Sequence, residues 1–168
     1  MKLDSLEDVF VHQLNDLYSA EDQLVEALPK MAKAASNEEL KEAFEHHLQE
    51  TRDHRDRVQE IFGQLGKRRA GTECKAMKGL IEEGEEVIKT SGGDSAAKDA
   101  ALIAAAQRVE HYEIAAYGTA RTLAGELGRW HALQADLPAL NRQLKAARLA
   151  PLRPDLAPPR DRNAADED

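Results

Sequence analysis

The sequence predicts an all-α protein, an antiparallel bundle of four helices with an additional short helix between the second and third of them. Composition is the first observation: aromatic residues make up only 4% of the 168 residues, and Ala, Leu, Glu, Lys and Gln are abundant, as is typical of helices. Periodicity is the second, because apolar residues recur every three or four positions over long stretches. The length fits one domain, predicted over residues 1–150. Residues 151–168, rich in Pro, Arg and Asp, have the composition of a disordered tail.

The first helix is predicted over residues 5–35. Ser5 and Asp8 have the spacing of a capping box, in which two side chains satisfy free backbone amides of the first turn. Pro29 lacks an amide proton and predicts a kink or a local break. The prediction is a long helix with a well-defined start.

The second helix is predicted over residues 36–65. Ser36 followed by Glu39 has the pattern of a helix start, and Gly66 marks the end. A basic loop then follows over residues 67–74.

Two helices follow, separated by the turn-forming string SGGD. The short one is predicted over residues 76–89. The long one is predicted over residues 95–127 and ends at Gly128. A last helix over residues 130–149 contains Pro138, which weakens the pattern.

Charge and cysteine content exclude several classes of protein. The net charge of -8 argues against nucleic acid as the main partner, because phosphate binding needs a basic surface. A single cysteine, Cys74, excludes an intramolecular disulfide framework. No apolar run approaches the roughly 20 residues of a membrane span. The N-terminal string MKLDSLEDVF lacks the apolar region of a secretion signal, so a cytoplasmic protein is expected.

The composition changes at residue 129. All ten glycines lie at or before Gly128, and five of the six prolines lie after it. Residues 1–128 hold 25 acidic and 16 basic residues, whereas residues 129–168 hold 6 and 7. The acidity of the chain therefore belongs to its first 128 residues.

Each long helix carries a carboxylate on or near its apolar stripe, since residues advance by about 100° per position. Leu17 and Leu24 flank Glu21 on the first helix. On the second, His47 and His54 lie within the stripe and Glu50 lies on its edge. The third places Glu113 near the centre of its stripe and Glu110 at the margin. The apolar stripe of the second helix consists of Leu40, Phe44, Val58, Ile61 and Leu65.

A carboxylate inside a helical core needs a partner, because burying an isolated charge costs on the order of several kcal/mol. Glutamates from several helices plus histidine, converging in a four-helix bundle, are typical of a site for two iron or two manganese ions. Any single glutamate on such a stripe is more often at an interface edge; it is the coincidence on three helices that favours a site. The usual Glu-x-x-His spacing is not met, since Asp53 stands three residues after Glu50. Glu82 and Glu83 are weaker candidates for the same cluster, and Tyr112 and Tyr117 are interpreted as packing residues.

Several strings closely resemble the YciE/YciF family of bacterial stress-associated proteins. They are EDVFVHQLNDLYSAEDQLVEALPKM, HLQET, GLIEEGEEVI and DAALIAAAQRVEHYEIAAYGTARTLAGELG, and they cover residues 1–128. The resemblance implies a ferritin-like bundle, a homodimer, and a metal site similar to those of rubrerythrins and ferritins. The matching positions are Glu21, His47, Glu50, Glu110 and Glu113. His54 is not carried over from the family.

The C-terminal part departs from the family. Members usually continue with a final amphipathic helix that carries an acidic stretch, which completes the bundle and the site. Here Asp136 is the only acid between Arg129 and Pro154. A shifted reading frame or a divergent terminus would explain the change, and the coding DNA distinguishes them.

Two functions are consistent with these features. The first is a stress-response protein that holds two iron or manganese ions and acts on peroxide or oxygen. The second is a non-enzymatic helical interaction protein whose acidic cluster is vestigial, which the missing acidic helix favours. Nothing in the sequence argues for a large iron-storage shell.

Overall fold

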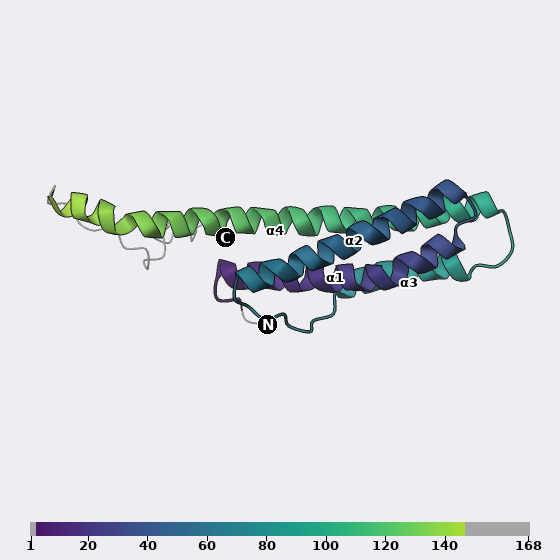
Figure 1. The fold of residues 1–168 in the computed structure, drawn as a ribbon, viewed down its shortest axis with the longest axis horizontal. Coiled ribbons are helices and arrows are strands. Elements are labelled where there is room, and N and C mark those ends of the chain that lie inside the picture. Colours follow the sequence, from purple (N-terminus) through teal and green to yellow (C-terminus); the bar gives the residue numbers. More distant parts are fainter. Residues whose placement is uncertain (1–2, 147–168) are drawn as a thin grey trace, which may run out of the picture. The chain divides into compact units, whose positions relative to one another are not determined.

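The computed structural model describes residues 3–146, and helices are the only regular elements in that part of the chain. The four helices are α1 (Leu6–Ala34), α2 (Glu38–Gln64), α3 (Lys75–Lys89) and α4 (Ser95–Ala146) (Figure 1). The predicted all-α bundle is confirmed. The chain divides into two compact units, Met1–Ala124 and Gly125–Asp168, and the residues of the candidate site described below lie in the first. None of the described helices carries an apolar stretch long enough to span a membrane.

Helix α1 begins as predicted. The Ser5 hydroxyl accepts a hydrogen bond from the Asp8 amide, and the Asp8 carboxylate accepts one from the Ser5 amide, both at 3.1 Å. The predicted capping box is therefore present. Pro29 lies within α1 without breaking it.

The bundle core follows the predicted stripes of α1 and α4. The buried members of the α1 stripe are Leu14, Leu17, Leu24 and Leu28, each at most 3% exposed. Leu102 and Val109 bring α4 to the same core, and Met77 brings α3. These positions recur with the 3.6-residue period of a helix.

The stripe of α2 differs from the prediction at its C-terminal end. Phe44 and Val58 are buried as expected, but Leu65 is exposed and Phe62 is buried in its place. Phe62 follows Val58 by four residues, so it lies on the same face and offers the larger apolar side chain.

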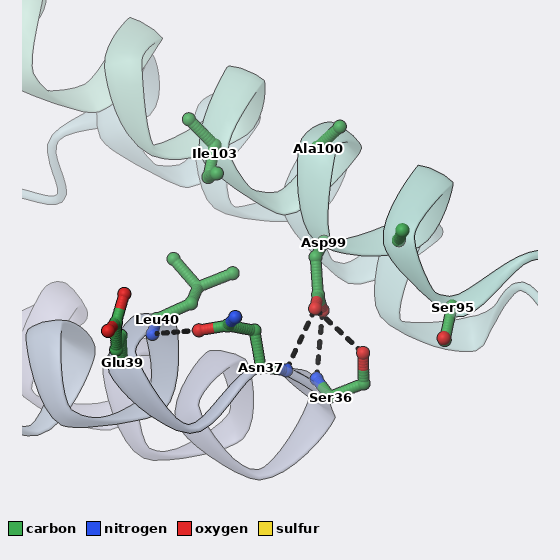
Figure 2. A pocket seen from close by; sticks show the side chains of 9 residues that line it. Ser36, Asn37, Glu39, Leu40, Ser95, Asp99, Ala100 and Ile103 are labelled. Carbon is green, nitrogen blue, oxygen red and sulfur yellow. Dashed lines mark hydrogen bonds between the residues drawn. The ribbon is translucent and has the colours of Figure 1, made fainter.

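Helix α2 begins at Glu38, two residues after the predicted start at Ser36, and its cap is Asn37. The Asn37 side chain accepts a hydrogen bond from the Leu40 amide at 3.0 Å. Ser36 instead forms hydrogen bonds with Asp99 of α4. The Asp99 carboxylate accepts hydrogen bonds from the Ser36 amide, the Ser36 hydroxyl and the Asn37 amide at 2.7–2.9 Å (Figure 2). Asp99 therefore fastens the start of α2 to the first turns of α4.

Helices α2 and α4 run parallel in a constant register within the first unit. Asp99 accepts a hydrogen bond from Ser36, Glu110 lies 3.2 Å from His47, and the ring of Tyr117 packs edge-on against that of His54. The partners in each of these three pairs are 63 residues apart in the chain. Helix α1 is antiparallel to α2, since only three residues connect them.

The last two predicted helices are one. Helix α4 continues through Gly128 and Pro138 to Ala146, so the predicted end at Gly128 is wrong. Positive φ angles occur at Gly66, Gly92 and Gly93 but not at Gly128. A glycine without the left-handed conformation does not cap a helix, and it costs only about 1 kcal/mol within one. Residues 147–149 and the predicted tail, 151–168, lie outside the described residues.

Candidate metal centre

Helix α1 contributes a fully buried carboxylate to the bundle. Glu21 is 0% exposed and lies between Leu17 and Leu24, which fix its direction by packing one turn to either side. Its Oε1 accepts a hydrogen bond from the Tyr117 hydroxyl at 2.5 Å. The sequence predicted the position of Glu21 but interpreted Tyr117 as a packing residue only.

Helix α4 contributes two glutamates three residues apart. Glu113 is buried, at 8% exposed, and the Glu110 side chain is 40% exposed. Residues three apart share one face of a helix, so both reach the same side of α4 at different depths. Glu110 thus forms the solvent edge of the cluster and Glu113 its interior.

Helix α2 presents three polar side chains over two turns. His47, Thr51 and His54 follow each other by four and three residues and therefore lie on one face. The His47 side chain is 18% exposed, Thr51 is 0% exposed, and the His54 side chain is 42% exposed. Thr51 was missed in the sequence, although its position between two inward histidines is a readable signal.

Three of these residues lie close enough together to ligate one metal ion. His47, Glu110 and Glu113 each offer a ligand atom, and these atoms lie within 4.8 Å of one another. A second contact brings His54 Nδ1 to 3.8 Å from Glu21 Oε1. Nitrogen and oxygen donors from three helices therefore face a common interior.

Several buried atoms in this interior have no hydrogen-bond partner within the described structure. They are Glu21 Oε2, Thr51 Oγ1, His54 Nδ1 and Glu113 Oε1. Buried polar atoms are normally paired, and each orphan costs about 1–3 kcal/mol. Their concentration on one cluster fits a cation, which would accept lone pairs from the carboxylates and the imidazole.

The pKa values of the two buried glutamates also indicate that the cluster lacks positive charge. Burial raises the pKa of Glu21 to about 7, against the lowering effect of the Tyr117 hydrogen bond. Burial and the nearby charges of Glu21 and Glu110 raise the pKa of Glu113 to about 8. A bound cation would favour the ionised form of both groups, because it supplies the positive charge that the cluster lacks.

Three of the sequence candidates lie elsewhere. The Glu50 side chain is 54% exposed and lies 3.5 Å from His46 on the outer face of α2. Glu83 is exposed and forms an ion pair with Arg108 at 3.0 Å. Glu82 is also exposed. The structure therefore does not bring these three into the group formed by His47, Glu110 and Glu113.

An open cavity of about 710 Å³ lies away from the cluster, at the start of α2 and α4. Asp99 is the buried acid in its wall, and both of its oxygens accept hydrogen bonds from Ser36 or Asn37 (Figure 2). Its charged lining group is thus already satisfied by protein. We place the candidate site at the carboxylate cluster for that reason.

Comparison with known proteins identifies close relatives. The profile of a family described as a domain of unknown function, DUF892, matches residues 5–149. The protein YciF of Escherichia coli (strain K12) is 50% identical over 129 residues, which cover 76% of this chain and 77% of that protein.

Solved structures agree with the sequence comparison. The crystal structure of the E. coli stress protein YciF superposes with a TM-score of 0.72 at 49% identity, covering 79% of this chain and 83% of that one. YcfI from Rhodopseudomonas palustris gives a TM-score of 0.70 at 42% identity, covering 76% and 82%.

Proposed function

Because this chain belongs to the DUF892 family and is 50% identical to the stress protein YciF over most of its length, we propose that it is a stress-response protein that holds two iron or manganese ions and acts on peroxide or oxygen. One observation carries the proposal: buried oxygen and nitrogen atoms without partners, gathered on a cluster contributed by α1, α2 and α4. Carboxylate and imidazole ligands suit these two metals.

The protein groups that would hold the ions are Glu21, His47, Glu110 and Glu113. The first and last are buried carboxylates on facing helices, and His47 lies beside Glu110 at the solvent edge. Glu50 stays a prediction of the sequence, because its side chain lies outside this group.

The bound metals would supply the one-electron chemistry that peroxide or oxygen reduction requires. The protein keeps bulk water from Glu21, which is completely buried, and leaves Glu110 partly open as the point of entry. Tyr117 holds one oxygen of Glu21 in place, so the other oxygen is directed to the interior. Such a site suits a small oxidant rather than a large substrate.

The same proposal includes a homodimer in the cytoplasm. The homodimer follows from the family resemblance, and the cytoplasmic location is the expectation from the sequence.

A second function has its own support. The raised pKa values of Glu21 and Glu113 mean that both carboxyls can be neutral at moderate pH without any ion. YcfI, a relative of the same fold, has been regarded as a candidate structural protein. A non-enzymatic helical stress protein with a vestigial cluster is therefore the alternative.

Metal content separates the two functions. The protein is purified without chelator, loaded anaerobically with Fe²⁺ or with Mn²⁺, desalted, and analysed for ions per chain. About two ions in the wild type, and none in a Glu21→Gln, Glu113→Gln double variant, support the proposal. An exposed-site control, Glu82→Gln, should retain the wild-type content. Fewer than about one ion per wild-type chain under both conditions favours the non-enzymatic function.

A further inference from the structure

The group formed by His47, Glu110 and Glu113 leaves part of the cluster unexplained. Glu21 Oε2 and His54 Nδ1 are buried atoms without hydrogen-bond partners, and neither residue belongs to that group. They come from α1 and α2, and their side chains approach to 3.8 Å. This pair needs a partner of its own.

The helix register separates the pair from the first group. His47 and His54 are seven residues apart on α2, which is about 10 Å of rise. Their partners on α4, Glu110 and Tyr117, are seven residues apart as well. Among the described residues, the group whose ligand atoms lie within 4.8 Å of one another contains His47 and not His54, so the two histidines are assigned to different ions.

The level of Glu21 and His54 differs from the upper level, that of His47 and Glu110. Glu21 is completely buried and is held by the Tyr117 hydroxyl, whereas Glu110 is 40% exposed. The histidines have the opposite order, since the side chain of His54 is 42% exposed and that of His47 is 18% exposed. Glu113 stands between the levels in sequence, three residues after Glu110 and four before Tyr117. On α2, Thr51 likewise lies between the two levels, four residues after His47 and three before His54, and its hydroxyl has no hydrogen-bond partner within the described residues.

Given the metal-binding function proposed above, we propose that His54 is a ligand and that, together with Glu21, it forms a second metal position. The upper position consists of His47, Glu110 and Glu113. The two positions are unequal: the upper one has a partly exposed acid, Glu110, whereas the second one combines a completely buried acid, Glu21, with a partly exposed imidazole, His54.

Mn²⁺ binding tests the assignment, with the bound ions counted by titration and the free ion followed by electron paramagnetic resonance. The wild type should bind two ions per chain. His54→Gln should bind one tightly and show at least about a 100-fold weaker second affinity, since even outer partners of a ligand cost 10–100-fold. Glu21→Gln should show the same loss.

Two controls fix the interpretation. His46→Gln, on the exposed face of the same helix, should keep both ions. His47→Gln should also reduce binding to one ion, but at the upper position. Helical circular dichroism checks that each variant is folded.

The outcomes distinguish this inference from the proposed function. If the wild type binds no Mn²⁺ and no Fe²⁺, the metal function itself is overturned. If the wild type binds two ions and His54→Gln still binds two with unchanged affinity, the metal function stands and the role of His54 is overturned.

Discussion

Helix α4 carries two buried acids with opposite environments. Asp99 is 7% exposed and Glu113 is 8% exposed, so burial does not distinguish them. Asp99 accepts three hydrogen bonds from the start of α2, and those bonds, the Ser36 amide first, hold its pKa below the usual range. Glu113 has an oxygen without a partner, and burial with neighbouring negative charge raises its pKa to about 8.

The difference teaches how a buried acid is to be interpreted. A carboxylate whose oxygens are all bonded by the protein stabilises the fold and has nothing left to offer a ligand. A carboxylate that is equally buried but lacks hydrogen-bond donors destabilises the fold unless a cation or a proton binds to it. The two regions around these acids therefore have different roles: the one around Asp99 fastens helices, and the one around Glu113 is suited to binding.

The largest expected effect is on the pH dependence of stability in the metal-free protein. The folded-state pKa values of Glu21 and Glu113 lie above the unfolded value of 4.5, so the folded protein binds more protons between about pH 4.5 and 8. The free energy of unfolding should therefore fall as the pH rises through this range, by about 3 kcal/mol for a shift of the size of Glu21's. Urea unfolding at pH 5, 6, 7 and 8 measures it.

The Glu21→Gln, Glu113→Gln double variant supplies the control for that slope. Its metal-free form should have a flatter profile and greater stability at pH 8 than the wild type. Glu82→Gln, which changes an exposed acid, should keep the wild-type slope. A wild-type stability that rises steadily from pH 5 to 8 would contradict the environment described for the cluster.

The start of α4, at Asp99, should respond in the opposite direction. Asp99→Asn removes the charged acceptor at the start of α2, so Tm should fall by a few degrees at pH 7. Because the pKa of Asp99 is lowered, the stability that its carboxylate provides is present at neutral pH and is lost as the pH falls through that pKa. The difference in Tm between wild type and variant should therefore shrink in acid, as thermal scans at pH 7 and pH 3 would show. Asp53→Asn, on the exposed face of α2, should change Tm little at either pH.

A smaller effect is expected at Tyr117. In the wild type, the hydrogen bond from Tyr117 lowers the pKa of the Glu21 carboxyl. Tyr117→Phe removes this bond, so the pKa of Glu21 should rise above about 7. Metal affinity should fall about tenfold without a change in stoichiometry, as for partners that position a ligand. Mn²⁺ titration against wild type measures it, and complete loss of one ion would show instead that the phenol is itself a ligand.

The smallest effect is expected at Glu50. Glu50→Gln changes an exposed side chain beside His46, so the ions bound per chain and their affinity should stay within about twofold of wild type. A large loss of metal would restore Glu50 to the site, as the family resemblance implies, and would mean that α2 rotates when ions bind.

The angular arrangement of α2 explains how far the sequence could predict the site. At about 100° per residue, Thr51, Val58 and Phe62 all lie within about 60° of His47 on one side, which sets the inward direction. His47 and His54 deviate moderately from it and are partly exposed, whereas Glu50 deviates by about 100° and is mostly exposed. The edge position that the sequence predicted for Glu50 was thus correct, but periodicity alone does not reveal which side of the edge faces solvent.

Other features depend on contacts between distant residues, which periodicity does not contain. Asp99 acts on Ser36 across 63 residues, so the sequence placed the cap of α2 one residue too early. The partners of Tyr117 and Thr51 are likewise set by the packing of three helices. Glu21 and Glu113 were predictable because each lies at the centre of its own stripe.

Because the offset between α2 and α4 is a constant 63 residues, the position of the cluster along both helices can be counted from the Asp99–Ser36 contact. Measured from that contact, the two proposed levels lie 11 and 18 residues along each helix. One extra residue between Asp99 and Glu110 would turn every α4 ligand by about 100° and move it about 1.5 Å, whereas an insertion in the loop over residues 67–74 would leave the spacing intact. Length between the fastening point and the cluster is thus as strict a requirement as the identity of the ligands.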